Sequence, residues 1–285
     1  MPAAMRIALI GGGKMGEAIL AGWLAAQEGP AASLAAESFT VVNPGRERRD
    51  HLRDAYGVAC CADAAELAAA EPFDMAVLAV KPQVMTEVLP VLSSLAPFQG
   101  GAAGPLFVSI AAGITTDALA QGLPAAAPVV RVMPNTPLQV GAGASAVCGG
   151  ACADSAQVGF VRDLFGCLGC AVEVDESQMD AVCALSGSGP AYVAAMIEAL
   201  VDAAAQEGLP AALAQKLAVQ TVLGTAALID ATGTSPRDAR LAVCSPGGTT
   251  LAALEAMDEA GFSQVFAAGV QAAARRSKEL AQCMR

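Results

Sequence analysis

Short apolar runs alternate with longer helix-forming stretches through the first 174 residues of the chain. Apolar runs of this length are typical of buried strands, and their alternation with helices predicts a parallel, doubly wound α/β sheet. The expected strands are Arg6–Ile10, Phe39–Asn43, Met75–Val80, Leu106–Ile110, Val129–Met133, Ala144–Cys148 and Ala171–Glu173. The expected helices are Lys14–Glu28, Glu47–Tyr56, Ala64–Ala70, Val84–Leu95 and Thr116–Gln121, with one more between the last two strands.

Beyond residue 174 the pattern becomes helical, and no strand is expected. The longest stretches are apolar around most of the helix circumference, for example from Ala211 to Leu228. A helix that is apolar all round is buried, and little chain remains to cover these helices, so we expect a second subunit to cover them. The sequence therefore predicts an all-α dimerisation domain over residues 175–285. Its expected helices are Ser177–Ala205, Pro210–Asp230, Thr250–Met257 and Phe262–Cys283.

A glycine-rich turn joins the first expected strand to the first expected helix. The pattern Gly11-x-Gly13-x-x-Gly16 lies directly between them, which is the context that a dinucleotide-binding fingerprint requires. In this motif the first glycine permits the tight turn, the second lets the backbone approach a pyrophosphate, and the third allows close helix–strand packing. Free N–H groups at the helix N-terminus then favour phosphate. We expect a Rossmann-like domain over residues 1–174; a glycine-rich turn without a ligand is the alternative.

The end of the second expected strand bears on the choice between NAD and NADP. An acidic residue there would bind the ribose 2′-hydroxyl of NAD, but the strand ends at Asn43 and three arginines follow within residues 46–49. Asn43 can hydrogen-bond a phosphate without repelling it, and Arg46 or a neighbour can pair with it. NADP is therefore favoured, with NAD possible; alternatively, these arginines only form the solvated first turn of a helix.

Three further loops leave expected strands at the edge where open α/β sheets bind ligands. They are Ala79–Pro82, Ile110–Gly113 and Met133–Pro137. Lys81 can hydrogen-bond a ribose or orient an acid, whereas Ala111 and Ala112 leave room for a flat ring. Loop residues lie at the surface, so a solvated Lys81 is the alternative.

The stretch Ser245–Thr250, with the sequence Ser-Pro-Gly-Gly-Thr-Thr, predicts a second anion-binding turn. The proline fixes one φ angle, the glycines let backbone N–H groups converge, and Thr250 lies near the start of the next expected helix. Such a turn suits a small carboxylate, with two hydroxyl groups nearby. The alternative is an ordinary helix cap supplied by Ser245 or Thr249, although a cap alone does not require Pro-Gly-Gly.

The sequence resembles the pyrroline-5-carboxylate reductases, the last enzymes of proline biosynthesis. The stretch Leu241–Leu251 is similar to that family's signature loop, and Met133–Pro137 and Leu185–Tyr192 are similar to two further motifs, in the family's order and spacing. With the glycine turn and Val80–Pro82, the resemblance spans nearly the whole chain. It implies a Rossmann domain followed by a helical domain that interlocks two subunits, in a homodimer or a ring of dimers.

The resemblance also implies a reaction and a set of site residues. The reaction is the reduction of 1-pyrroline-5-carboxylate to L-proline by hydride transfer from NADPH to the cyclic imine carbon. Thr250 would be the catalytic hydroxyl, and the substrate carboxylate would be held by Ser245, Gly247, Gly248 and Thr249. The residues expected at the cofactor are Ile10, Gly11, Gly12, Gly13, Lys14, Met15, Gly16, Asn43, Arg46, Ala79, Val80, Lys81, Pro82, Ile110, Ala111, Ala112 and Asn135. Asp63 and Ala64 stand where many members carry an asparagine, which weakens the cofactor contact expected there.

Composition and charge narrow the function further. Hydrophobic residues make up 55% of the 285 residues and charged residues 15%, as in a globular protein. The net charge of −11 argues against a nucleic-acid partner, which needs a basic surface. Uninterrupted apolar runs stay below the roughly 18 residues of a membrane-spanning helix when Gly, Pro and charges count as breaks. Met1–Arg6 is too short for a secretory signal before the first strand, so we expect a cytoplasmic protein.

The nine cysteines and the single histidine predict neither a metal site nor a disulfide framework. Cys148, Cys152, Cys167 and Cys170 have a spacing near that of zinc ribbons, but they lie at or beside expected strands, where thiols act as small hydrophobes. His51 lies in a charged helix and is expected to be exposed and structural. Histidine-dependent dehydrogenase chemistry is therefore not expected, and a cyclic imine does not need it because its nitrogen can already carry the proton.

Three other classes of protein remain open on the sequence alone. A hydroxyacid dehydrogenase would need a catalytic lysine in the helical half, where Lys216 and Lys278 both lie in ordinary helical context. A non-catalytic NADP sensor would keep the glycine turn but has no use for Ser245–Thr250. A structural oligomer would explain the apolar helices but neither turn. The two turns together favour the reductase.

Overall fold

The computed structural model describes residues 5–282 and divides into two compact units. The first unit comprises the residues up to Ser188 together with those from Ala273 on, and the second comprises Gly189–Ala272. The domain boundary expected between residues 174 and 175 directly follows the last strand of the sheet, and it stays a prediction. The expected end of the last helix, at Cys283, lies outside the described residues.

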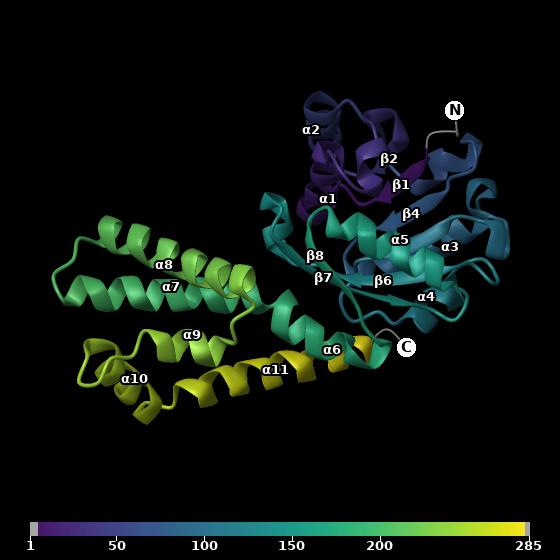
Figure 1. Cartoon of the computed structure of the whole chain (residues 1–285). Helices are drawn as coiled ribbons and strands as arrows, with labels where there is room; N and C mark the ends of the chain where they lie inside the picture. Colours follow the sequence, from purple (N-terminus) through teal and green to yellow (C-terminus); the bar gives the residue numbers. More distant parts are fainter. Residues whose placement is uncertain (1–4, 283–285) are drawn as a thin grey trace. The chain divides into compact units, whose positions relative to one another are not determined.

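The first unit is built around one sheet, which Figure 1 shows together with its covering helices. Within residues 5–282 it has eight strands in the order β3-β2-β1-β4-β5-β6-β7-β8. Every neighbouring pair is parallel except β6 and β7. This order confirms the predicted doubly wound, Rossmann-like sheet. The strands are β1 (Ile7–Ile10), β2 (Phe39–Val42), β3 (Ala59–Cys61), β4 (Met75–Leu78), β5 (Leu106–Ser109), β6 (Val129–Met133), β7 (Gly143–Gly149) and β8 (Gly169–Glu173).

Two features of the sheet differ from the sequence-based expectation. β7 runs antiparallel to β6, whereas the alternation of strands and helices predicts parallel strands throughout. The connection over residues 134–142 is shorter than the roughly one dozen residues that a parallel crossover needs, so the chain returns alongside β6 in the opposite direction. β3 is not predicted, because its three residues are small and form no apolar run.

Helices cover both faces of the sheet because successive strand residues point to opposite faces. In β1, Ile7 and Leu9 belong to one buried cluster, and Ala8 and Ile10 belong to the other. The first cluster is completed by α1 (Lys14–Ala25), α2 (Arg46–Tyr56) and α5 (Ser155–Gly166). The second is completed by α3 (Pro82–Ser94), α4 (Thr116–Gly122) and the 3₁₀ turns Ala64–Ala69 and Ala96–Phe98. The helix expected over Ala64–Ala70 is thus a 3₁₀ turn.

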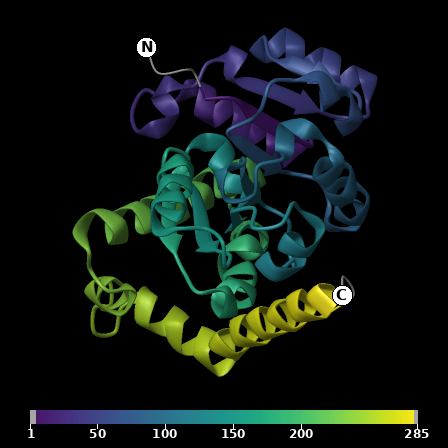
Figure 2. The same ribbon diagram turned by 90° about the vertical axis from the view of Figure 1, so that its right-hand side faces the viewer.

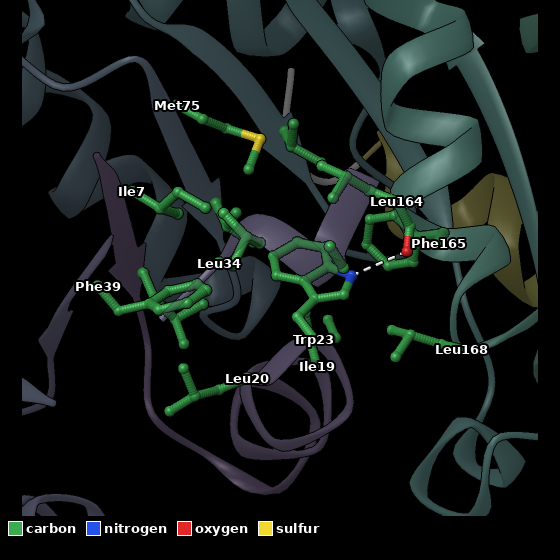
Figure 3. Close-up of a cluster of buried hydrophobic side chains, with 14 of the residues drawn as sticks. Ile7, Ile19, Leu20, Trp23, Leu34, Phe39, Met75, Leu164, Phe165 and Leu168 are labelled. Carbon is green, nitrogen blue, oxygen red and sulfur yellow. Dashed lines mark hydrogen bonds between the residues drawn. The ribbon is translucent and has the colours of Figure 1, made fainter. Parts of the chain in front are cut away.

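Trp23 holds α1 against α5, as Figure 3 shows. Its buried ring meets Phe165 edge-on, with ring centroids 5.5 Å apart, and lies 6.4 Å from the ring of Phe39. The indole N–H donates a hydrogen bond to the carbonyl oxygen of Leu164 at 2.9 Å, so burial of the ring leaves its donor paired. This contact fixes the helix that starts at the glycine turn.

The second unit consists of α7 (Gly189–Gln206), α8 (Ala211–Thr232), α9 (Pro236–Ala242), α10 (Thr249–Glu259) and the first part of α11 (Phe262–Gln282). The helices α7 and α8 lie side by side in Figure 1, and α11 is one continuous helix in Figure 2. The expected continuous helix over 177–205 is instead α6 (Met179–Val182), a π-helical turn over Cys183–Gly187, and α7. The seven-residue helix α9 is not predicted from the sequence.

Large apolar side chains remain exposed on the helices of the second unit. Leu217, Leu223, Leu228 and Val265 are each more than half exposed. By length and composition alone, Glu176–Gln206 and Ala211–Thr232 are also apolar enough to cross a membrane. These segments are not predicted from the sequence when every glycine and charged residue counts as a break. A long helix tolerates one or two such residues. The chain by itself therefore leaves these faces uncovered.

Candidate active site

A cavity of about 570 Å³ lies at the carboxyl ends of β1, β2 and β4. Its walls come from the glycine turn after β1, the Asn43 loop after β2, residues 62–65 after β3, and the loop after β4. The order of the strands reverses at β1, and this is where open α/β sheets bind ligands. The expected cofactor residues that line the cavity are Ile10, Gly11, Gly13, Asn43, Ala79, Val80 and Lys81.

The shape of the glycine turn depends on residues that lack a β-carbon. Gly11 has a φ of +111°, and a β-carbon there would lie 2.5 Å from the carbonyl oxygen of Ala79. A β-carbon at Gly16 would collide with the carbonyl oxygen of Gly11, because α1 begins directly against the turn. At Gly13, the N-cap of α1, a β-carbon would meet nothing within 4 Å. Gly13 therefore faces the open space into which a pyrophosphate can enter.

The three arginines that follow β2 have different surroundings. Arg48 donates from Nε to the carbonyl oxygen of Gly12 at 2.6 Å, and Arg49 donates to the carbonyl oxygens of Asn43 and Pro44 at 2.8 and 2.7 Å. The side chain of Arg46 is 89% exposed, with its Nε 3.6 Å from a carboxylate oxygen of Asp50. Of the three, Arg46 has the guanidinium that is free to turn toward a ligand at Asn43.

One apolar wall of the cavity was not anticipated. Val84, Val88 and Val91 line it at helical spacing along α3, together with Glu87 and residues 62–65. Valines at this spacing are usually core residues, but the buried residues of α3 are Met85, Leu89 and Leu92, each one position further along. The 62–65 segment includes Asp63 and Ala64, so the structure brings to the cavity two residues at which a weakened contact is expected. The Asp63 carboxylate accepts a hydrogen bond from the backbone N–H of Glu66 at 3.2 Å.

Ten of the expected cofactor residues do not line this cavity: Gly12, Lys14, Met15, Gly16, Arg46, Pro82, Ile110, Ala111, Ala112 and Asn135. Ala111 is buried, and its N–H donates to the hydroxyl of Ser109 at 3.3 Å. The buried amide of Asn135 accepts from the N–H of Ala144 at 2.8 Å and donates to the carbonyl oxygen of Ser186 at 3.0 Å. Asn135 thus holds its own loop, and its contact with a cofactor stays a prediction.

An ion pair between the buried Arg131 and the partly exposed Glu176 connects the elements beside two of the expected cofactor loops. Arg131 of β6 is 3% exposed, and its Nη1 lies 2.6 Å from a carboxylate oxygen of Glu176. The other oxygen of Glu176 accepts from both the N–H and the hydroxyl of Thr116, at the start of α4. This network ties together β6, which leads into the Met133–Pro137 loop, and α4, which follows the Ile110–Gly113 loop.

The second expected turn, Ser245–Thr250, lies between α9 and α10 in the helical unit. Gly247 has a φ of +68°, and the N–H of Gly248 donates to the carbonyl oxygen of Ser245 at 3.0 Å. Gly248 is the N-cap of α10, and no side chain caps the helix. The alternative that Ser245 or Thr249 serves as N-cap is therefore wrong. The first N–H groups of this helix remain available to an anion, and Thr250 lies among them in the first turn.

Neither the described cysteines nor the histidine lines this cavity. Burial raises the pKa of the Cys61 thiol to about 11 and that of the Cys148 thiol to about 12. Among residues 5–282, no group of three His, Cys, Asp or Glu side chains is placed to hold a metal ion. His51 is exposed, with Nε2 2.6 Å from a carboxylate oxygen of Glu17, which agrees with the expected structural role.

Comparison with known proteins covers both units. The model of the family described as NADP oxidoreductase, coenzyme F420-dependent, matches residues 6–127, and the model described as pyrroline-5-carboxylate reductase dimerisation matches residues 176–280. The pyrroline-5-carboxylate reductase of Synechocystis sp. is 45% identical over 276 residues, which are 97% of this chain and 98% of that protein. The apolar helices α7 and α8 fall within the dimerisation match.

Solved structures show the same relationship over the whole length. A pyrroline-5-carboxylate reductase from Coxiella burnetii matches with a TM-score of 0.86 and 33% identity, covering 97% of this chain and 98% of that one. Pyrroline carboxylate reductase from Plasmodium falciparum, with NADP bound, matches with a TM-score of 0.83 and 28% identity, also covering 97% and 98%. This chain belongs to the pyrroline-5-carboxylate reductase family.

Proposed function

We propose that this protein reduces 1-pyrroline-5-carboxylate to L-proline with NADPH, by hydride transfer to the carbon of the cyclic imine, as the last step of proline biosynthesis. The observation that carries the proposal is the cavity built on the glycine turn, in a chain that is 45% identical to a named reductase along its whole length. The dinucleotide supplies the hydride when it is bound. The residues of the chain bind, orient and polarise the two reactants.

The residues present at the cavity fit a dinucleotide phosphate. Gly13 faces open space at the N-terminus of α1, where backbone N–H groups favour a pyrophosphate. Asn43 and the exposed guanidinium of Arg46 would hold a 2′-phosphate, since neither repels it and Arg46 has no other strong partner among the described residues. Lys81 would hydrogen-bond a ribose, and the valines of α3 would lie against the purine. NADPH is the proposed donor, and NADH a weaker substitute.

The uncapped first turn of α10 fits the carboxylate of the substrate. Ser245, Gly247, Gly248 and Thr249 would hold it through backbone N–H groups and hydroxyls. The Thr250 hydroxyl would hydrogen-bond the ring nitrogen and deliver or order its proton. Because an iminium carbon is already electrophilic, positioning and a favourable field are sufficient for hydride transfer.

The proposed assembly is a homodimer in which the helical units cover each other's apolar faces, with rings of such dimers as the larger form. The match to a dimerisation family over residues 176–280 accounts for these faces without a membrane. The proposed location is the cytoplasm. The net charge of −11 argues against a nucleic-acid partner.

The test is a turnover assay with purified protein, 1-pyrroline-5-carboxylate and either NADPH or NADH, following the absorbance of the reduced nicotinamide. Thr250→Ala should lower kcat by roughly one to three decades, within the range of general acid–base catalysis. Thr250→Ser is the matched control, because it keeps the hydroxyl and should keep most of the turnover. An unchanged kcat in Thr250→Ala would remove this residue from the mechanism.

A further inference from the structure

A carboxylate lies in the first turn of the helix that would receive the cofactor phosphates. Glu17 is four residues beyond the N-cap Gly13, and its backbone N–H donates to the carbonyl oxygen of Gly13 at 2.8 Å. A negative charge here is favourable for the isolated helix, because it complements the partial positive charge of the N-terminus. The same charge opposes the binding of an anion at that end of the helix. A dinucleotide site at this turn therefore requires that Glu17 be neutralised.

Three side chains of α2 converge on Glu17. Arg48 pairs with one carboxylate oxygen through Nη2, while Nε2 of His51 and the hydroxyl of Tyr56 lie 2.6 and 3.2 Å from the other. Burial of Glu17 opposes its ionisation, but the hydrogen bonds from His51, Arg48 and Tyr56 and the charge of Arg48 outweigh burial and lower its pKa. Glu17 is therefore ionised at neutral pH, and the permanent cation beside it is Arg48.

Arg48 also forms a hydrogen bond with the backbone of the glycine turn. Its Nε donates to the carbonyl oxygen of Gly12 at 2.6 Å, so one guanidinium joins the turn, α1 and α2. In a trans peptide the C=O and the following N–H point in opposite directions. Holding the carbonyl of Gly12 toward α2 therefore turns the N–H of Gly13 away from α2. Gly13 lines the cavity and Gly12 does not.

We propose that Arg48 is a positioning residue for the cofactor, which it serves in two linked ways. It orients the Gly12–Gly13 peptide so that the N–H of Gly13 is presented to the phosphates, and it cancels the charge of Glu17 that would repel them. This inference rests on the proposed function, since it concerns the NADPH site of the reductase. The arginines after β2 would then have separate roles. Arg46 would bind the cofactor directly, whereas Arg48 would position the glycine turn that binds it.

A purely structural role predicts a different outcome. If Arg48 only joined α2 to α1, its replacement would lower the unfolding temperature. Removing the charge of Glu17 as well would then not restore the affinity for NADPH. If Arg48 cancels a charge that faces the phosphates, the removal of that charge restores binding. Screening by salt should also reduce the loss of NADPH affinity that follows the removal of Arg48, because Glu17 and Arg48 are partly exposed.

The experiment measures the Kd of NADPH by calorimetric titration, without turnover, for the full-length protein and its Arg48→Met variant. We expect Arg48→Met to weaken NADPH binding about tenfold at low salt, with a smaller defect at high salt. The double variant Glu17→Gln/Arg48→Met should recover the part of the loss that is due to the charge of Glu17, while the part due to the orientation of the Gly12–Gly13 peptide remains. Arg53→Met is the matched control on the same helix, since the guanidinium of Arg53 pairs with Asp50 and donates to the carbonyl oxygen of Cys60, and does not reach the glycine turn or Glu17 by any hydrogen bond or ion pair among the described residues. Its Kd should equal that of the wild type.

Two results would overturn the inference: an unchanged Kd in Arg48→Met, or a double variant that binds as weakly as Arg48→Met alone. If Arg48→Met does not fold, the single variant Glu17→Gln decides, because it removes the repelling charge and should bind NADPH no more weakly than the wild type. Weaker binding by Glu17→Gln would contradict the inference. Failure of the wild-type protein itself to bind NADPH would instead refute the proposed function.

Discussion

The substitution Gly13→Ala separates the folding of the glycine turn from its binding. At Gly13 φ is −71° and ψ is −174°, which any L-residue adopts, and a β-carbon would meet nothing within 4 Å. Alanine lowers the entropy of the unfolded chain, which stabilises by about 0.4–1 kcal/mol, but it is a poorer N-cap than glycine by a similar amount. These effects oppose each other, so we expect the Tm of the cofactor-free protein to move by no more than a few degrees.

The binding of NADPH should respond very differently. The added methyl group would occupy the space through which the pyrophosphate approaches the backbone. Overpacking of this kind costs about 1–3 kcal/mol, which corresponds to a Kd that is roughly 5- to 150-fold weaker. Gly13→Ala should therefore retain its fold and bind NADPH more weakly.

Gly16→Ala is the matched control, because it has the same chemistry three residues further along. Its β-carbon would collide with the carbonyl oxygen of Gly11, so α1 must shift before any ligand is present. Thermal unfolding without cofactor should show a clear loss of stability for Gly16→Ala and almost none for Gly13→Ala, and calorimetric titration should show weak NADPH binding for Gly13→Ala. Wild-type affinity in Gly13→Ala would refute the position assigned to the pyrophosphate.

Three further predictions follow from contacts around the site. Arg46→Ala should weaken NADPH about tenfold, the loss of one charged hydrogen bond, and leave NADH unchanged; equal losses in kinetic assays with the two cofactors would contradict the role of Arg46. Arg131→Met should cost about 1.5–3 kcal/mol in urea unfolding, because it removes a hydrogen bond between charged groups from Glu176, whose side chain is 30% exposed, and a loss below about 0.5 kcal/mol would contradict this. The pKa of Glu17 is lowered from its ordinary 4.5 by folding, so its ionisation stabilises the protein above that pH and this contribution is lost as the pH falls below it. The stability difference between wild type and Glu17→Gln should accordingly shrink in acid, and a difference that grew there would contradict the assignment.

The sequence predicted most of the first unit because its strands are buried on both faces. Such strands are continuous apolar runs, so β1, β2, β4, β5 and β6 lie where the pattern places them. The pattern missed β3, at the edge of the sheet, where three small residues pair with β2. It also missed α9, which has no apolar stripe, although Ser235 followed by Pro236 and Asp238 is a start signal that could have been used.

Some residues of the candidate site can likewise be predicted from the sequence, and others cannot. The glycine turn, Asn43 and Lys81 follow strands directly, so their place at the carboxyl edge of the sheet could be predicted from a motif and a topological rule. The contact of Arg48 with Glu17 joins residues that are 31 positions apart, and that of Arg131 with Glu176 joins residues 45 apart. Such pairs depend on how helices and strands pack. The valines of α3 were missed for a related reason, because spacing alone does not show which face of a helix meets the core.

If the cavity at the glycine turn serves the reduction of a cyclic imine carboxylate, purified protein should oxidise NADPH only when 1-pyrroline-5-carboxylate is present. The decisive assay follows NADPH oxidation with and without this substrate and identifies L-proline as the product. We expect substrate-dependent oxidation, faster with NADPH than with NADH, and formation of one proline for each NADPH consumed. Folded protein that binds NADPH but forms no proline with either cofactor would contradict the proposed function.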